Sequence, residues 1–330
     1  MKAFLVIACI LMAGFLLTGC SAGSRQFPAS SSAPESAVVL PVSDESGSQT
    51  SAQEATLWFR FSTEPYLAPE SRAITQRKGQ SYEMALLEAL FAGPGTQHHE
   101  LVGALPEGSR VISAVLQGRV LLVTVSGEFL GMPADIPMDW QEYDFWRTEA
   151  PLRRKLAMQS IAATVSENCD VDAVQILVDE NIADGASLRL KQNWFLDDSE
   201  ESRLTGPQYR DESLLLTPAG TGKAILRHWL ERDWENLYLY VSQRDPQSGM
   251  TRPEYRNFAA SMNGLPSLIS AELMDCSVSE DGQRTTVSVH ARIRPDQGQR
   301  EISRNAVLHL ARENGIWKLS FSQLTEWLEE

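Results

Sequence analysis

The first residues place the strongest constraint on this chain, because seventeen consecutive positions, Ala3–Gly19, carry no charged side chain. A helix that crosses a bilayer needs about 20 apolar residues, so this run is at the short limit of a membrane span. A positive residue, here Lys2, followed by an apolar core that ends in small residues is typical of a secretory signal peptide. We therefore expect residues 1–19 to be a cleaved signal peptide. The alternative is an uncleaved N-terminal anchor helix.

The end of this run, Leu17-Thr18-Gly19-Cys20, resembles the lipobox of bacterial lipoproteins. The resemblance implies cleavage just before Cys20 and attachment of a diacylglycerol to its thiol by a thioether. Two or more acyl chains, such as palmitate, make membrane attachment stable, whereas a single chain is marginal. We therefore expect an extracytoplasmic lipoprotein that is anchored to the cell membrane by lipid on Cys20.

Two polar segments divide the rest of the chain. Ser21–Glu54 is rich in Ser, Ala, Pro, Gly and Gln and cannot bury enough apolar surface to offset its conformational entropy. Leu196–Asp211 is dense in acidic residues and shows no apolar periodicity. The organisation we expect is a lipidated Cys with a disordered tether over 20–54, a domain over 55–195, a linker over 196–215 and a second domain over 216–330.

The charge balance and the missing motifs exclude several classes of protein. Against 43 Asp+Glu there are 29 Lys+Arg, a net charge of −14, so a protein that binds nucleic-acid phosphates is not expected. The sequence contains no Gly-rich phosphate loop, HExxH, CxxC or GxSxG pattern. We therefore expect no enzyme, no cofactor and no metal.

Between residues 55 and 195 the hydrophobic pattern predicts a strand, a helix, a hairpin, a second helix and a strand. Ser81 is an N-cap for the first helix and Gly93-Pro94 ends it. Gly118 supplies the hairpin turn, and Pro65 and Pro69 indicate a loop after the first strand. The predicted elements are Ala55–Phe61, Tyr82–Phe91, Arg110–Val115, Val120–Val125, Leu152–Val165 and Val171–Val178, with Ser187–Leu190 as a further edge strand.

Three stretches of this region resemble the GerMN domain of bacterial sporulation and spore-germination lipoproteins. They are ALLEALFAGPG at 85–95, LPEGSRVISAVLQGRVLLVTVSGEFL at 105–130 and VDAVQILVDE at 171–180. The resemblance implies an α/β sandwich and a role in sporulation or germination. Glu128 and Asp179 fall at matching family positions near strand ends, where we interpret them as surface or capping carboxylates.

The second region, 216–330, is predicted to hold two helices followed by an antiparallel sheet. Thr217–Tyr240 has a broad apolar face, and Asn314-Gly315 is a strong hairpin signal. This order resembles the cone-shaped nuclear transport factor 2-like (cystatin-like) fold, and ENGIWKLSF at 313–321 resembles its last hairpin in bacterial lipoproteins. The fold class is therefore α+β, a GerMN-like sandwich followed by an α+β cone. The other predicted elements are Arg252–Met262, Leu273–Val278, Thr285–Ile293, Ile302–Ala311 and Trp317–Phe321.

The histidines that could carry chemistry have simpler interpretations. His98-His99 follow Gly93-Pro94 with no third ligand nearby, so we expect both to be solvated. His228 and Asp233 could form an acid-base pair at the mouth of the cone. Because they are five residues apart, they do not share a helical face, and we expect a surface His228 instead.

Cys169 and Cys276 are the thiols of the folded part, and two readings of them stay open. They could pair across the two domains, because the expected compartment permits oxidation. The interpretation that we favour is two unlinked, partly buried thiols, since sequence spacing cannot establish contact.

Four aromatic residues, Trp140, Tyr143, Phe145 and Trp146, lie within seven positions in a segment that also holds Pro133 and Pro137. Such a cluster could form an exposed contact surface for a protein or glycan partner. Alternatively, the segment folds back and caps the first domain.

These observations favour a membrane-anchored, non-enzymatic binding or scaffold component of an envelope complex in sporulation or spore germination. Its partners would be an envelope protein or peptidoglycan, together with the membrane. The alternative is a receptor for a small ligand or peptidoglycan fragment that uses the cavity of the C-terminal cone. A wall hydrolase would need two carboxylates about 5–10 Å apart in a cleft, which the sequence does not indicate.

Overall fold

The computed structural model describes residues 52–182, 186–197, 203–245, 248–295 and 300–326. The expected signal peptide, Cys20 and nearly all of the expected tether lie outside the described residues. The described chain is a mixed α and β protein with three sheets, and it belongs to one compact unit. The domain boundaries stay predictions.

The first sheet has the order β2-β1-β3 and includes a strand that the sequence did not predict. β1 (Ala52–Phe61) was expected, but β2 (Leu67–Thr75) replaces the loop expected around Pro69. Pro69 lies opposite Trp58 on this edge strand, where the missing N–H breaks no inner ladder. The short β3 (Leu101–Val102) completes the sheet.

The first helix is as the local signals predicted. α1 spans Tyr82–Phe91, and the Ser81 hydroxyl accepts a 3.2 Å hydrogen bond from the Met84 backbone N–H. Gly93 follows the helix with a positive φ of 86°, which a glycine adopts without steric cost. The N-cap Ser81 and the helix-ending Gly93 therefore suffice to predict both ends of this helix.

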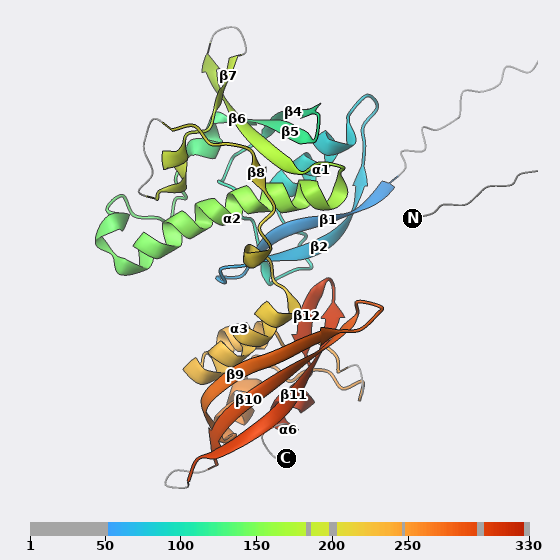
Figure 1. The fold of residues 1–330 in the computed structure, drawn as a ribbon, viewed down its shortest axis with the longest axis vertical. Helices are drawn as coiled ribbons and strands as arrows, with labels where there is room; N and C mark the ends of the chain where they lie inside the picture. The colour runs from blue at the N-terminus through green and yellow to red at the C-terminus, as the bar shows by residue number, and fades with distance from the viewer. Residues whose placement is uncertain (1–51, 183–185, 198–202, 246–247, 296–299, 327–330) are drawn as a thin grey trace, which may run out of the picture. The chain divides into compact units, whose positions relative to one another are not determined.

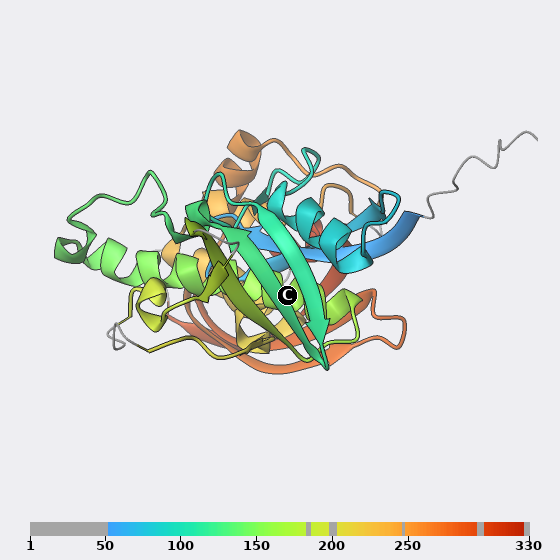
Figure 2. The same ribbon diagram turned by 90° about the horizontal axis from the view of Figure 1, so that it is seen from above.

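The second sheet has the order β4-β5-β6-β7, and β8 (Gln208–Tyr209) also pairs with β6. The predicted hairpin is confirmed as β4 (Val111–Gln117) and β5 (Val120–Ser126), with Gly118 at φ 63°. β5 then runs parallel to β6 (Ala173–Ile182), and the predicted edge strand is β7 (Ala186–Arg189). Figure 2 shows β4, β5 and β6 side by side.

The crossover between β5 and β6 is the 25-residue helix α2 (Asp144–Asn168). Ten consecutive α2 residues, 156–165, are buried, so the helix is covered on all sides. Figure 1 shows α2 running between β6 and β1. The Ser160 hydroxyl donates to the Trp58 carbonyl, and the Trp58 N–H donates to the Thr164 hydroxyl, so two hydrogen bonds hold α2 to β1. α2 begins eight residues before the predicted Leu152, so part of the expected aromatic loop is helical.

In the C-terminal region, the stretch Thr217–Tyr240 forms two helices instead of the single predicted one. α3 (Pro218–Glu231) and α4 (Trp234–Leu239) are separated by Arg232, whose φ is 58°. A left-handed residue ends an α-helix, and here no glycine marks that end in the sequence. α5 (Tyr255–Gly264) is the second predicted helix, but it begins three residues after the predicted Arg252, so Pro253 lies before it and not in its first turn.

The third sheet is antiparallel, in the order β12-β11-β10-β9. Asn314 and Gly315 both have positive φ, as the predicted hairpin requires. α3 packs on β9 (Figure 1), and at Gly222 a β-carbon would lie 3.0 Å from the Val287 side chain, so a glycine permits the close approach. The elements are β9 (Ser267–Val278), β10 (Arg284–Arg294), β11 (Ile302–Glu313) and β12 (Ile316–Leu319), followed by α6 (Phe321–Glu326).

Residues of the two regions share one buried apolar cluster. The Phe61 and Tyr240 rings lie 4.9 Å apart, and the buried Lys318 ammonium lies 2.9 Å from the Glu100 carboxylate. Within the described ranges, no helix is both long enough and apolar enough to cross a membrane.

Candidate functional site

The four predicted contact aromatics lie on two adjoining elements, and we call them the aromatic patch (Trp140, Tyr143, Phe145 and Trp146). Trp140 opens a short 3-10 helix (Trp140–Glu142), Tyr143 is the N-cap of α2, and the other two are in its first turn. Tyr143 and Phe145 are 50% and 64% exposed, whereas Trp140 and Trp146 are half-buried. The segment is therefore anchored by its tryptophans while it presents two aromatic rings to solvent.

Ring and charge contacts hold the patch in place. The Phe145 and Trp146 rings meet edge to face at 5.0 Å, and the Arg153 guanidinium lies 5.2 Å from the Trp146 ring centre. Such a cation–π contact is worth about 0.5–1 kcal/mol at an exposed site. Arg153 lies about two turns after Trp146 in α2, so this contact holds the Trp146 ring against the helix.

A cleft of about 680 Å³ adjoins the patch at Phe145, and several of its charged side chains pair with one another. Glu149 accepts hydrogen bonds from Arg60 at 2.5 Å and from Arg153 at 2.7 Å, and Arg153 also pairs with Asp135 at 2.7 Å. Burial opposes ionisation of Glu149, but the two arginines outweigh it and hold the pKa of this carboxyl below its usual value. The cleft is thus a polar neighbour of the patch without a strong field of one sign.

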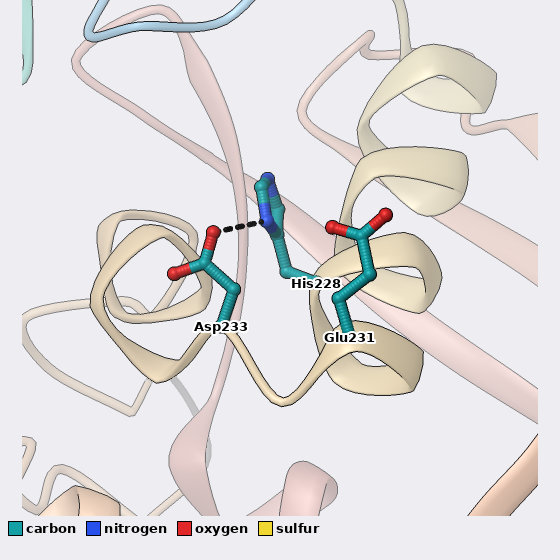
Figure 3. Close-up of side chains that lie close together, drawn as sticks. All are labelled: His228, Glu231 and Asp233. Carbon is teal, nitrogen blue, oxygen red and sulfur yellow. Dashed lines mark hydrogen bonds and ion pairs between the residues drawn. The ribbon is translucent and has the colours of Figure 1, made fainter.

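A second group of polar and charged side chains surrounds the buried His228, and we call it the His228 cluster (Glu64, Arg227, His228 and Asp233). Glu64 is buried as well, whereas Arg227 and Asp233 are half-buried. His228 Nε2 lies 2.6 Å from Glu64 Oε1, and Nδ1 lies 3.1 Å from Asp233 Oδ2. The Arg227 guanidinium donates to the other Glu64 oxygen. Figure 3 shows the contact between His228 and Asp233, with Glu231 on the other side of the ring.

The expectations for His228 are wrong on both points. His228 is only 4% exposed, and it does meet Asp233. The reason is the break at Arg232, which turns the chain after α3 and brings Asp233, the N-cap of α4, back to the ring. A spacing of five residues excludes contact only within one continuous helix.

The hydrogen bonds of the His228 cluster favour charged carboxylates. Burial of Glu64, which is 2% exposed, opposes ionisation, but hydrogen bonds from His228 and Arg227 hold the pKa of this carboxyl below its usual value. Burial likewise opposes ionisation of Asp233, and Asn236 and His228 outweigh it, so its pKa is lowered. Both nitrogens of the His228 ring face carboxylate oxygens, and Nε2 also lies 3.0 Å from the Arg227 guanidinium.

The same region contains a possible set of metal ligands, because ligand atoms of His228, Glu231 and Asp233 lie within 4.8 Å of one another. The carboxylate of Asp233, however, already accepts hydrogen bonds from the side chain of Asn236 at 2.7 Å, from the Asn236 backbone and from His228. Since N–H donors occupy these lone pairs, the arrangement fits a hydrogen-bonded cluster better than a metal centre. Glu64 and His228 are also too deeply buried to reach a substrate.

The remaining residues that the sequence singled out lie outside both groups. His98 is buried rather than solvated, and its Nδ1 has no hydrogen-bond partner in the described chain, whereas His99 is exposed. Cys169 and Cys276 are unlinked and half-buried, as we favoured. Glu128 is half-exposed and lies 3.8 Å from Arg110. Cys20 lies outside the described residues.

Comparison with known proteins gives a family match to part of the chain. Residues 56–184 match the family model described as "Germane: Sporulation and spore germination". No curated protein matches the sequence. The match covers the first sheet, α1, α2 and the strands β4, β5 and β6 of the second sheet, whereas β7 and β8 lie beyond it.

Three solved structures resemble parts of the fold. The tandem GerMN domains of the sporulation protein GerM from Bacillus subtilis are 15% identical over 51% of this chain and 48% of that chain, with a TM-score of 0.33. The first GerMN domain of the same protein is 16% identical over 48% of this chain and 96% of that chain, with a TM-score of 0.30. An LEH-like epoxide hydrolase from M. tuberculosis is 9% identical over 33% of this chain and 82% of that chain, with a TM-score of 0.23. This chain thus spans about half the length of the tandem-domain structure, and the family match supports a GerMN domain over residues 56–184.

Proposed function

We propose that this protein is a non-enzymatic binding component of a cell-envelope complex in sporulation or spore germination. The family match over residues 56–184 supports the process. The lipobox-like end of the first twenty residues supports attachment to the membrane through lipid on Cys20. An acyl anchor and a tether would then present the folded part to its partner outside the cytoplasm.

The observation that carries a binding role is the exposure of Tyr143 and Phe145 on anchored elements. Exposed aromatic rings that are held rigidly lose little conformational entropy on binding, and aromatic residues are enriched at interaction hot spots. The half-buried tryptophans and Arg153 supply that rigidity. The envelope partner would therefore cover the start of α2.

The test is capture of the partner in intact cells by crosslinking of the tethered protein. We expect the variant Tyr143→Ser/Phe145→Ser, and likewise Trp140→Ala/Trp146→Ala, to lose the crosslinked partner. Tyr209→Ser is the matched control, because Tyr209 is 63% exposed but lies on β8. If the patch variants recover the same partner as the native chain, the patch is not the contact surface.

The lipid anchor has its own test. Mass analysis of the mature protein should find a diacylglycerol-modified Cys20 as the first residue, and Cys20→Ala should release the protein from the membrane fraction. An unmodified thiol or an intact leader would reject the anchor while leaving the patch experiment interpretable.

A second candidate function is a receptor that uses the C-terminal region, which we propose has the nuclear transport factor 2-like cone. Its support is a cavity of about 680 Å³ at the end of the third sheet, lined by Arg284, His309 and Lys318 among others. A ligand that binds only the native state raises the melting temperature. A thermal-shift panel of muropeptides and germinants, with no response from any, would reject this candidate.

A further inference from the structure

A cavity of about 720 Å³ in the first region carries charges of one sign only. Its charged lining residues are Arg154 of α2, Arg189 of β7 and Lys191, and none of the described residues that line it is acidic. The chain as a whole carries a net charge of −14, so a wholly cationic cavity runs against its composition. Such a cavity favours an anion.

Much of the remaining wall is apolar. Leu188 and Leu204 line the cavity and are about half-exposed, and Trp194 forms part of its buried side. Exposed leucines around a concave surface lose unfavourable contact with water when an apolar group covers them. A volume in this range is typical of sites for small ligands.

Arg154 is the residue that most needs a counter-ion. It is 3% exposed, and its guanidinium donates to the backbone carbonyls of Phe129 and Leu130 at 3.2 Å and of Gly131 at 2.7 Å. No carboxylate in the described ranges pairs with it, and its buried Nε has no hydrogen-bond partner there. Burial lowers the pKa of Arg154 to about 10, so it is still charged near neutral pH.

The other two arginines of the neighbouring cleft do have carboxylate partners, unlike Arg154. Arg60 and Arg153 line that cleft with Arg154, and both pair with Glu149 at 2.7 Å or less. On the cavity side, Arg189 donates to the neutral Gln175 amide oxygen at 3.1 Å. A buried charge normally has a counter-ion, because removing it from water is costly.

We propose that this cavity binds an anionic amphiphile, with its apolar part on Leu188, Trp194 and Leu204. Its carboxylate or phosphate group would lie among Arg154, Arg189 and Lys191. The exposed side chains of Arg189 and Lys191 supply charge-assisted hydrogen bonds to that group, and the buried charge of Arg154 attracts it. Fatty carboxylates and the phosphate of a membrane lipid share this chemistry.

The test is calorimetric titration of the full chain with decanoate, decyl phosphate and the neutral 1-decanol, each below its aggregation concentration. We expect the two anions to bind saturably and 1-decanol to bind at least about tenfold more weakly, because it cannot pair with the cations. Arg189→Gln/Lys191→Gln should weaken anion binding about tenfold or more. The matched control Arg203→Gln removes a nearby charge that does not line the cavity, and its affinity should be native.

The results separate the site from non-specific binding. Tighter binding of decyl phosphate than of decanoate would assign the lipid-phosphate source, and the reverse order would assign a fatty carboxylate. Equal binding of 1-decanol and decanoate would overturn the proposal, as would a double variant that binds like the native chain. In the latter case the ligand would be on another apolar surface. Failure of both anions to bind would overturn it as well.

Discussion

The His228 cluster contains the half-buried Arg227 and α2 contains the buried Arg154, and the two arginines differ in what faces their charge. His228 lies between two carboxylates, and Arg227 shares one of them. Arg154 faces backbone carbonyl oxygens and the Trp194 ring, whose centre lies 4.6 Å from its guanidinium, and no carboxylate of the described residues pairs with it. Partial charges of this kind do not neutralise a guanidinium. In the His228 cluster each charged group already has a partner, so the cluster has no unpaired charge for a ligand. Its pairs connect Glu64, in the turn before β2, to α3. The Arg154 arrangement is incomplete without an anion.

The comparison also shows why burial alone does not identify a functional site. Glu64 and Arg154 are equally hidden from water, and both carry a charge. A paired group stabilises the fold in which its partner is placed, whereas an unpaired one raises the free energy of the unliganded protein. Their substitution should therefore have different consequences.

The largest effect on stability is expected for Glu64→Ala. The variant leaves His228 and part of Arg227 buried without the carboxylate, and breaking a buried pair in this way costs about 3–5 kcal/mol of unfolding free energy. Guanidinium unfolding of the full chain measures it. Glu231→Ala is the control, because Glu231 is an exposed neighbour, and its cost should stay within about 0.5 kcal/mol. Equal losses in the two variants would show that the Glu64 pairing does not stabilise the fold.

The second prediction concerns pH. The pKa of Glu64 in the folded chain lies below its ordinary value of 4.5, so the folded state binds fewer protons than the unfolded state in this range. Its stabilising contribution is therefore complete above about pH 5 and is lost as the pH falls through the folded pKa. Unfolding free energies of the native chain and of Glu64→Gln between about pH 7 and about pH 3 test this. The native curve should fall more steeply below about pH 4.5; parallel curves would contradict the linkage to Glu64.

A third experiment compares the paired and unpaired arginines directly. Arg60→Met leaves the buried Glu149 with one arginine fewer and should cost about 3 kcal/mol. Arg154→Met removes donors from three carbonyls but also removes an uncompensated charge, so we expect a smaller loss of about 1–2 kcal/mol. Denaturant unfolding of both variants gives the order. A larger loss for Arg154→Met would mean that capping of these carbonyls is its main role.

How far the sequence predicted these features depends on how local their causes are. Ser81 and Gly93 set the ends of α1, and Gly118 and Gly315 set two hairpins, all through interactions within a few residues. The sequence did not predict β2, because Pro69 is unfavourable in most strands. A proline is acceptable here only because β2 is an edge strand.

The candidate sites depended on contacts that no sequence window contains. The partner of Glu64 is 164 positions away, and Asp233 reaches His228 only because Arg232 ends α3 without a glycine. Arg154 bonds to backbone carbonyls, which every residue possesses, so no sequence pattern marks it. The four residues of the aromatic patch, in contrast, lie within seven positions of the sequence, so the sequence alone predicted this cluster.

The smallest effects on stability are expected in the patch, and they separate its anchored rings from its presented ones. Trp146→Ala removes the contact with Arg153 and should cost about 0.5–1 kcal/mol, whereas Phe145→Ser, at a largely exposed ring, should stay within about 0.5 kcal/mol. If the proposed role is right, both variants lose the crosslinked partner, because one misplaces the surface and the other removes part of it. Unfolding and capture must therefore be measured on the same preparations. A Phe145→Ser chain of native stability that still captures its partner would leave the exposed ring without a role in binding, and only the anchored tryptophans would remain to carry it.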